Sequence, residues 1–63
     1  MVKGTITRFV DDRGFGFIKP EGSNEDVFFH QSAFEGQPRE GMAVEFDTEA
    51  SDRGPRAINV RAA

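Results

Sequence analysis

The stretch that decides the fold runs from Arg13 to Lys19 and reads Arg-Gly-Phe-Gly-Phe-Ile-Lys. In a β-strand, side chains at i and i+2 point to the same face. A strand here therefore places Phe15 and Phe17 side by side, with a cation at each end. Gly14 and Gly16 carry no side chain, so we expect a flat ligand to approach the backbone there. Paired rings with flanking cations suit base stacking in single-stranded nucleic acid, but paired rings also suit the core of a half-buried strand.

Length and composition allow one small domain. The chain has 63 residues and no cysteine, so neither disulfides nor thiolate metal sites can stabilise it. Hydrophobic residues make up 37% of the chain, which is enough for a small core and too much for a disordered segment. The N-terminus has no apolar run typical of a signal peptide, and no segment is long enough to span a membrane. We therefore expect a cytoplasmic protein with no membrane partner.

The charge pattern argues against one class of nucleic-acid binder. The net charge is −3, with eight Lys and Arg against eleven Asp and Glu, which argues against a basic protein that coats duplexes. The charges are unevenly spread. The segment from Arg53 to Arg61 has three arginines and no acid, whereas Glu35 to Asp52 has six acids and one arginine. We therefore expect one locally basic end on an acidic molecule.

The chain as a whole predicts short strands separated by turns. Gln31–Phe34 suits one helical turn, and no longer amphipathic helix can be placed. Alternation puts Val44 and Phe46 inside, and it puts Ile58 and Val60 on one face of the last strand. A flat sheet of this size would leave a face and two edges uncovered, so we expect a small closed barrel. The predicted strands are Thr5–Val10, Arg13–Lys19, Asp26–His30, Met42–Thr48 and Arg56–Val60.

The third predicted strand bears on the choice between core and binding surface. In Val-Phe-Phe-His, residues 27–30, Val27 and Phe29 suit the barrel interior, which leaves Phe28 and His30 outside. Antiparallel pairing with the second strand sets this outer pair beside the outer rings of that strand. A lone surface histidine is usually only solvated, but a patch of three Phe and one His is typical of a binding site. The patch therefore favours stacking over the core interpretation.

With both motifs in view, the sequence resembles the bacterial cold shock proteins and the related cold shock domain over nearly its whole length. Gly14–Ile18 resembles the family's first nucleic-acid motif, and Val27–His30 resembles its second. The resemblance implies a single domain over residues 1–63, folded as an all-β, five-stranded antiparallel OB-type barrel. Such barrels bind single-stranded RNA and DNA through exposed aromatic side chains. Further matches lie at Gly4, Ser32, Ala33, Arg53, Gly54, Pro55, Ala57, Asn59 and Val60.

The resemblance also implies which residues make contact with nucleic acid. The stacking residues carried over from the family are Phe9, Phe15, Phe17, Phe28 and His30. The polar contacts that we propose beside them are Arg13, Lys19, Asp26 and Arg53. The cellular role that follows from the family is RNA chaperoning, which means melting weak RNA structure or aiding transcription and translation.

Several positions depart from the family pattern. Arg8 stands where members usually carry Trp, Thr7 where they carry Lys, and Gln31 where an aromatic is common. The loop over residues 36–41 is shorter than usual and lacks the aromatic of many members. Phe34 could replace that aromatic, but a cap over the barrel end is the better interpretation. The aromatic patch available for stacking is therefore smaller than the family norm.

Arg8 has two interpretations. Its guanidinium can stack on a base and meet a phosphate, or it can be a solvated surface group. Strict alternation places Arg8 on the inner face with Ile6, so an outward Arg8 requires a bulge in the first strand.

We therefore expect a monomer that binds single-stranded RNA and DNA with little sequence preference, without cofactor or metal. One His, no Cys and no Gly-rich phosphate loop argue against an enzyme. The alternative is a protein-interaction barrel that uses the same aromatic patch, which the acidity slightly favours. An RNA-recognition motif needs two helices, for which the chain has no room.

Overall fold

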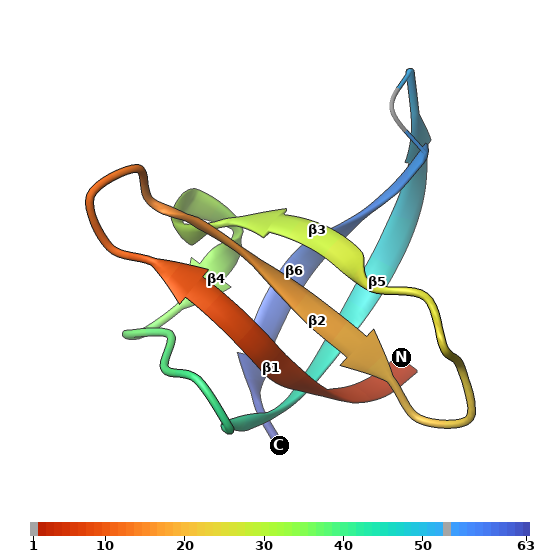
Figure 1. Cartoon of the computed structure of the whole chain (residues 1–63), viewed down its shortest axis with the longest axis horizontal. Coiled ribbons are helices and arrows are strands. Elements are labelled where there is room, and N and C mark those ends of the chain that lie inside the picture. Colours follow the sequence, from red (N-terminus) through yellow and green to blue (C-terminus); the bar gives the residue numbers. More distant parts are fainter. Residues whose placement is uncertain (1, 53) are drawn as a thin grey trace.

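Short strands and a single 3-10 turn make up the described chain (Figure 1). The computed structural model describes residues 2–52 and 54–63. The strands are β1 (Val2–Val10), β2 (Phe15–Pro20), β3 (Val27–His30), β4 (Phe34–Glu35), β5 (Ala43–Ser51) and β6 (Gly54–Ala62), and the 3-10 turn η1 (Gln31–Ala33) joins β3 to β4.

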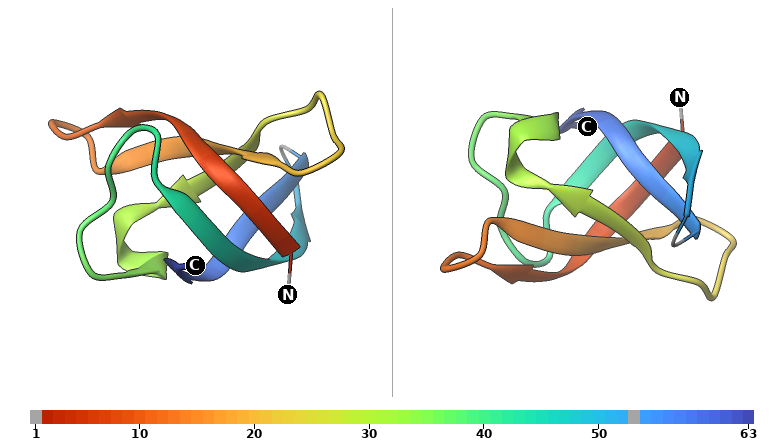
Figure 2. Two further views of the ribbon diagram at one scale, coloured as in Figure 1. Left: turned by 90° about the horizontal axis from the view of Figure 1, so that it is seen from below. Right: turned by 90° about the horizontal axis from the view of Figure 1, so that it is seen from above.

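Five of these strands close into a barrel. The sheet order is β3-β2-β1-β5-β6-β4, and an additional β3–β6 pairing joins the two ends. The pairs along β3-β2-β1-β5-β6 are antiparallel, whereas β6 pairs in parallel with both β3 and the two-residue β4. Figure 2 shows strands from opposite sides crossing one another around the interior. The predicted five-stranded all-β barrel is confirmed, with β4 as a short addition beside β6.

The core fills the barrel with apolar side chains from every strand. The alternation argument placed Val27, Phe29, Val44 and Phe46 inside, and all four are buried. Phe34 is also buried, with its ring 6.3 Å from that of Phe29, so it belongs to the core. The full set is Ile6, Ile18, Val27, Phe29, Phe34, Val44, Phe46, Ala57 and Val60.

A bulge in β1 turns Arg8 outward. Ile6 pairs with Ile18, yet Arg8 pairs with Phe17, so Thr7 is an extra residue on this strand. A bulge of this kind rotates the residues that follow it to the other face. Ile6 is therefore buried while Arg8 is exposed, and the condition for an outward Arg8 is met.

A second bulge changes the inward face of β6. The pairing with β5 shifts between Glu45↔Arg61 and Asp47↔Ile58, so β6 carries one residue more than β5 across this step. Asn59 has φ +52°, a left-handed conformation that Asn tolerates better than most residues. As a result the buried residues of β6 are Ala57 and Val60, while Ile58 is half-buried. The prediction that Ile58 and Val60 share a face was wrong.

The β1–β2 connection is a turn that takes up part of the predicted second strand. The backbone N–H groups of Arg13 and Gly14 donate to the carbonyl of Val10, at 3.2 and 2.9 Å. Residues 13 and 14 therefore precede β2 instead of opening it. In Figure 1 this turn lies at the same end of the barrel as η1 and the loop over residues 36–42.

Pairing between the last two strands sets acidic residues of β5 opposite basic residues of β6. Glu49 faces Arg56 and Glu45 faces Arg61 in register. The Arg56 side chain forms an ion pair with Glu49, with Nε donating to Oε1 at 2.6 Å. Of the three arginines expected to form a basic end, Arg56 and Arg61 thus lie opposite acids of β5, and Arg53 lies outside the described residues.

Candidate nucleic-acid interface

The pairing of β2 with β3 brings four side chains together on the outside of the barrel. Phe15 lies opposite His30, and Phe17 lies opposite Phe28. The ring centroids of Phe15 and Phe17 are 6.2 Å apart, those of Phe15 and Phe28 are 5.7 Å apart, and those of Phe17 and Phe28 are 6.0 Å apart. These spacings are typical of interacting aromatic pairs. We call Phe15, Phe17, Phe28 and His30 the aromatic platform.

The platform faces away from the core. The Phe28 side chain is 39% exposed, Phe15 and Phe17 are half-buried, and His30 is exposed. The residues between them, Gly16 and Phe29, are buried on the inner face. The rings thus pack against one another on the outer face of the barrel.

A hydrogen bond from the 3-10 turn fixes the His30 ring. The backbone N–H of Ser32 donates to Nδ1 of His30 at 3.1 Å, and the Ser32 hydroxyl lies 2.9 Å from the same atom. Because Nδ1 is the acceptor, the neutral ring carries its proton on Nε2. Nε2–H is then a donor for a base or a phosphate. Ser32 was noted in the sequence only as a family match.

The glycines of the motif serve packing, so the expectation that they admit a ligand was wrong. A Cβ on Gly16 would collide with the carbonyl of Arg8 and lie 2.8 Å from the Phe29 ring. Gly14 has φ +73°, and a Cβ there would lie 2.9 Å from the side-chain amide of Gln31. Both glycines are buried. They allow β1 and the start of η1 to approach β2 closely.

Arg8 and Phe9 occupy different places. Arg8 is exposed and lies across from Phe17, next to the platform. Phe9 is half-buried, and its ring stacks on Phe29 at 6.0 Å with an angle of 16° between the planes. Phe9 therefore lies apart from the platform and lines a separate cavity.

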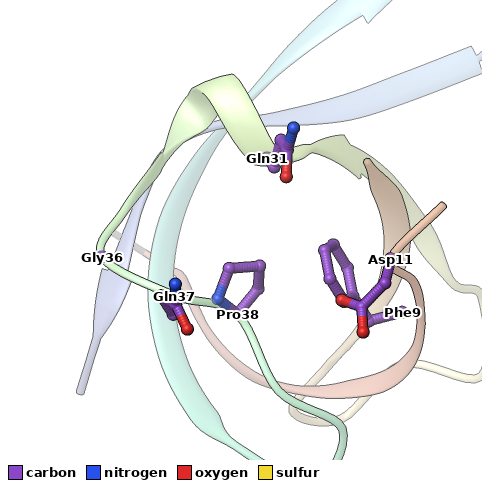
Figure 3. A pocket seen from close by; sticks show the side chains of 6 residues that line it. All are labelled: Phe9, Asp11, Gln31, Gly36, Gln37 and Pro38. Atoms are coloured by element: carbon purple, nitrogen blue, oxygen red, sulfur yellow. The ribbon is translucent and has the colours of Figure 1, made fainter. Parts of the chain in front are cut away.

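That cavity lies between the β1–β2 turn, the start of η1 and the loop before β5 (Figure 3). Its volume is about 320 Å³. Sequence reasoning did not predict that Gln31 and the loop residues would line a cavity with Phe9, because no local pattern predicts which loops meet. The lining residues are Phe9, Asp11, Gln31, Gly36, Gln37 and Pro38.

The predicted polar contacts are spread over the molecule. Lys19 is exposed and continues the outer row of Phe15 and Phe17 along β2. Arg13 is exposed in the turn at the opposite end, and Asp26 is exposed just before β3. Arg53 lies outside the described residues. The structure thus does not bring the predicted polar contacts into one cluster.

Arg56 is a cation that sequence reasoning missed. The single register pair between β3 and β6 joins Phe28 to Arg56, which is exposed. Barrel closure creates this neighbour, so the local sequence carried no signal for it. Glu49 holds the Arg56 guanidinium in the ion pair described above.

Within residues 2–52 and 54–63, no group of three or more His, Cys, Asp or Glu side chains is placed to hold a metal ion. The same part of the chain contains no helix that is long and apolar enough to cross a membrane.

Comparison with known proteins places this geometry in a family. The 'Cold-shock' DNA-binding domain matches residues 2–63. The cold shock-like protein CspC of Escherichia coli K12 is 42% identical over 65 residues, which cover 97% of this chain and 94% of the relative. The cold shock protein CspA of Staphylococcus aureus NCTC 8325 is 48% identical over 64 residues, which cover 95% of this chain and 96% of the relative.

A solved structure agrees. The Drosophila Unr CSD456 structure superposes with a TM-score of 0.78 at 26% sequence identity, covering 98% of this chain and 26% of that one. The OB-type barrel predicted from the two motifs is thereby confirmed. The chain belongs to the cold shock domain family of nucleic-acid-binding proteins.

Proposed function

We propose that the protein binds single-stranded RNA and DNA by stacking unpaired bases on the aromatic platform. The observation that carries the proposal is the cluster of three rings, spaced 5.7 to 6.2 Å apart and turned away from the core. A base stacked on an aromatic side chain is worth ~1–3 kcal/mol and needs no particular sequence, since every base has a π-face. Binding at the platform therefore has little sequence preference.

Cations at the edges hold the sugar-phosphate chain. Lys19 lies on the same outer row as the rings, Arg8 lies across from Phe17, and Arg56 lies beside Phe28. The imidazole Nε2–H of His30 adds one donor at the other end of the platform. Each group acts by position and charge, and none forms or breaks a covalent bond.

This binding mode supports an RNA chaperone role. A protein that binds a single strand but not the duplex shifts the strand equilibrium towards the unpaired form by mass action. Weak hairpins open first, because their pairing free energy is smallest. The proposal includes a monomeric cytoplasmic protein that acts without enzymatic activity, as expected from the sequence.

The test compares the affinity of the protein for single strands with its affinity for a duplex. Fluorescein-labelled oligo-dT and oligo-U heptamers are titrated with the protein and followed by anisotropy, beside a labelled duplex of equal length. We expect both single strands to bind much more tightly than the duplex, and a weak RNA hairpin to melt at a lower temperature with protein present. Equal affinity for duplex and single strands contradicts the proposal.

A complete absence of binding to single strands favours the alternative, in which the platform meets another protein. Sedimentation of the protein alone then shows whether that partner is a second copy.

A further inference from the structure

The cavity lined by Phe9, Gln31 and Pro38 adjoins the platform. Gln31 follows His30 directly, and its backbone N–H donates to the carbonyl of Gly14 at 2.7 Å. Gly14 in turn precedes Phe15. The end of the platform formed by Phe15 and His30 is therefore directly beside Gln31, which lines the cavity, so the base that follows those stacked there is positioned to enter it.

The walls of the cavity suit a flat ring. Figure 3 shows the Phe9 ring and the Pro38 ring on facing sides, with the Gln31 side chain between them at one end. Phe9 is backed by Phe29, whose ring is nearly parallel to it. The Phe9 wall is therefore supported from behind, and it offers a π-face on which a base can stack. A volume of about 320 Å³ lies at the small end of the usual range for ligand pockets.

The rim carries hydrogen-bonding groups that are not paired within the protein. The Asp11 carboxylate and the amides of Gln31 and Gln37 line the cavity. Over the described residues, none of these three side chains makes a hydrogen bond to another protein group. The Gln31 amide also packs against Gly14, where a Cβ would lie 2.9 Å from its Nε2. Both acceptors and donors are thus available to a ligand edge.

We propose that this cavity takes one guanine base and reads its Watson–Crick edge. The inference rests on the proposed function, since it extends the same bound strand by one base. Guanine presents two adjacent donors, N1–H and the N2 amino group, which match the two oxygens of the Asp11 carboxylate. Its O6 accepts from an amide N–H of Gln31 or Gln37.

The other bases fit the rim less well. Uracil and thymine offer a single donor flanked by two acceptors, which a carboxylate repels. Adenine and cytosine offer an amino group beside a ring nitrogen acceptor, so only one carboxylate oxygen is satisfied. The negative charge of Asp11 also disfavours a phosphate at this place, so the cavity selects a base rather than the backbone. The protein thus combines stacking without base preference on the platform with selective recognition of one base in the cavity.

The test uses a labelled dT heptamer and its variants with a single dG, dA or deoxyinosine at each position. Inosine lacks the N2 amino group and keeps the other groups of guanine. We expect dG at one position to tighten binding roughly five- to tenfold over dT, within the range of a bidentate base contact. Inosine at that position should lose most of the gain, and dA should give none.

Two variants in the same turn test whether the Asp11 carboxylate, and not the charge of the turn in general, causes the preference for dG. Asp11→Asn should abolish the preference for dG and change the affinity for the all-dT strand by less than about threefold. Asp12→Asn removes the same charge one residue away, at an exposed residue that does not line the cavity, and should keep the preference. Circular dichroism confirms that both variants fold.

The outcomes are distinct. Tight binding of dT heptamers with no gain from dG at any position overturns the guanine site and leaves the proposed function intact. A dG preference that survives Asp11→Asn, or that inosine reproduces in full, also overturns it. Failure of the wild type to bind any single strand overturns the proposed function and the guanine site together.

Discussion

Phe17 packs against both other rings of the platform and lies across from Arg8, so in the proposed function it is the central residue against which a base stacks. Its position followed from the two-residue period of a strand. The outward direction of Arg8 followed from the bulge at Thr7, which only the structure shows. A guanidinium offers a flat face and a charge, whereas the Trp usual in the family offers a larger face and no charge.

Arg8→Trp should therefore tighten binding of a single-stranded heptamer by about 1 kcal/mol, roughly fivefold in Kd. The dependence on salt should become slightly shallower, because one cation near the phosphates is lost. Arg8→Ala should weaken binding, though less than Phe17→Ala does. Anisotropy titrations of wild type and these variants measure the change. Equal affinities for wild type, Arg8→Ala and Arg8→Trp would show that position 8 makes no contact.

The close packing around Gly16 leads to a prediction about the stability of the fold. An added methyl group would collide with the Arg8 carbonyl and the Phe29 ring, both of which are held by the barrel. Gly16→Ala should lower the free energy of unfolding by ~1–3 kcal/mol, the usual cost of overpacking. Urea unfolding followed by circular dichroism measures it. An unchanged midpoint would mean that β1 and β2 are further apart than the structure places them.

The barrel closes where β6 pairs with β3, and this pairing places a cation, Arg56, beside the platform. The last two strands were predicted from their residues, but the sequence could not show that Arg56 would lie beside Phe28. Likewise, alternation misplaced Ile58, because the bulge at Asn59 inserts an extra residue into β6. Period-two reasoning works within a regular strand and fails across a bulge. The cavity was missed because three separate connections form it.

The ion pair between Glu49 on β5 and Arg56 on β6 leads to a prediction about binding. Glu49 accepts a hydrogen bond from Nε of Arg56 at 2.6 Å, so we expect it to compete with a phosphate for this guanidinium. Glu49→Gln should tighten binding of single strands and make the salt dependence of log K steeper by about 0.7, the contribution of one further phosphate contact. Stability should change by less than about 1 kcal/mol, since the pair is exposed. Glu45→Gln, opposite Arg61, serves as a control of equal charge. If both variants behave alike, the effect is one of net charge and not of Arg56.

The whole molecule is an acidic barrel with an aromatic outer patch. Its net charge of −3 cannot attract a strand from a distance, so the proposed function requires that most of the affinity comes from stacking. Composition alone predicts this balance, and it argues against a protein that coats duplexes. The redistribution of charge, with the acids of β5 against the arginines of β6, emerged only from the strand pairing.

The salt dependence of binding by the wild-type protein is expected to be weak. Few cations lie near the platform, so we expect few phosphates to be neutralised on binding. The slope of log K against log salt for single strands is about −0.7 per phosphate contact, so it should stay shallower than about −3. Titrations with oligo-dT at several salt concentrations measure it. A steeper slope would mean that charge carries the affinity instead of stacking.

The most direct test of the account compares Phe28→Ala with Phe29→Ala. These neighbours carry the same side chain on opposite faces of β3, since Phe28 is 39% exposed and Phe29 is fully buried. Phe28→Ala should weaken binding of an oligo-dT heptamer by ~1–3 kcal/mol. Its loss of unfolding free energy should be well below that of Phe29→Ala, which should cost ~3–5 kcal/mol. If Phe28→Ala instead destabilises the fold as much as Phe29→Ala while its folded molecules bind as tightly as wild type, the ring is part of the core and the platform does not bind nucleic acid.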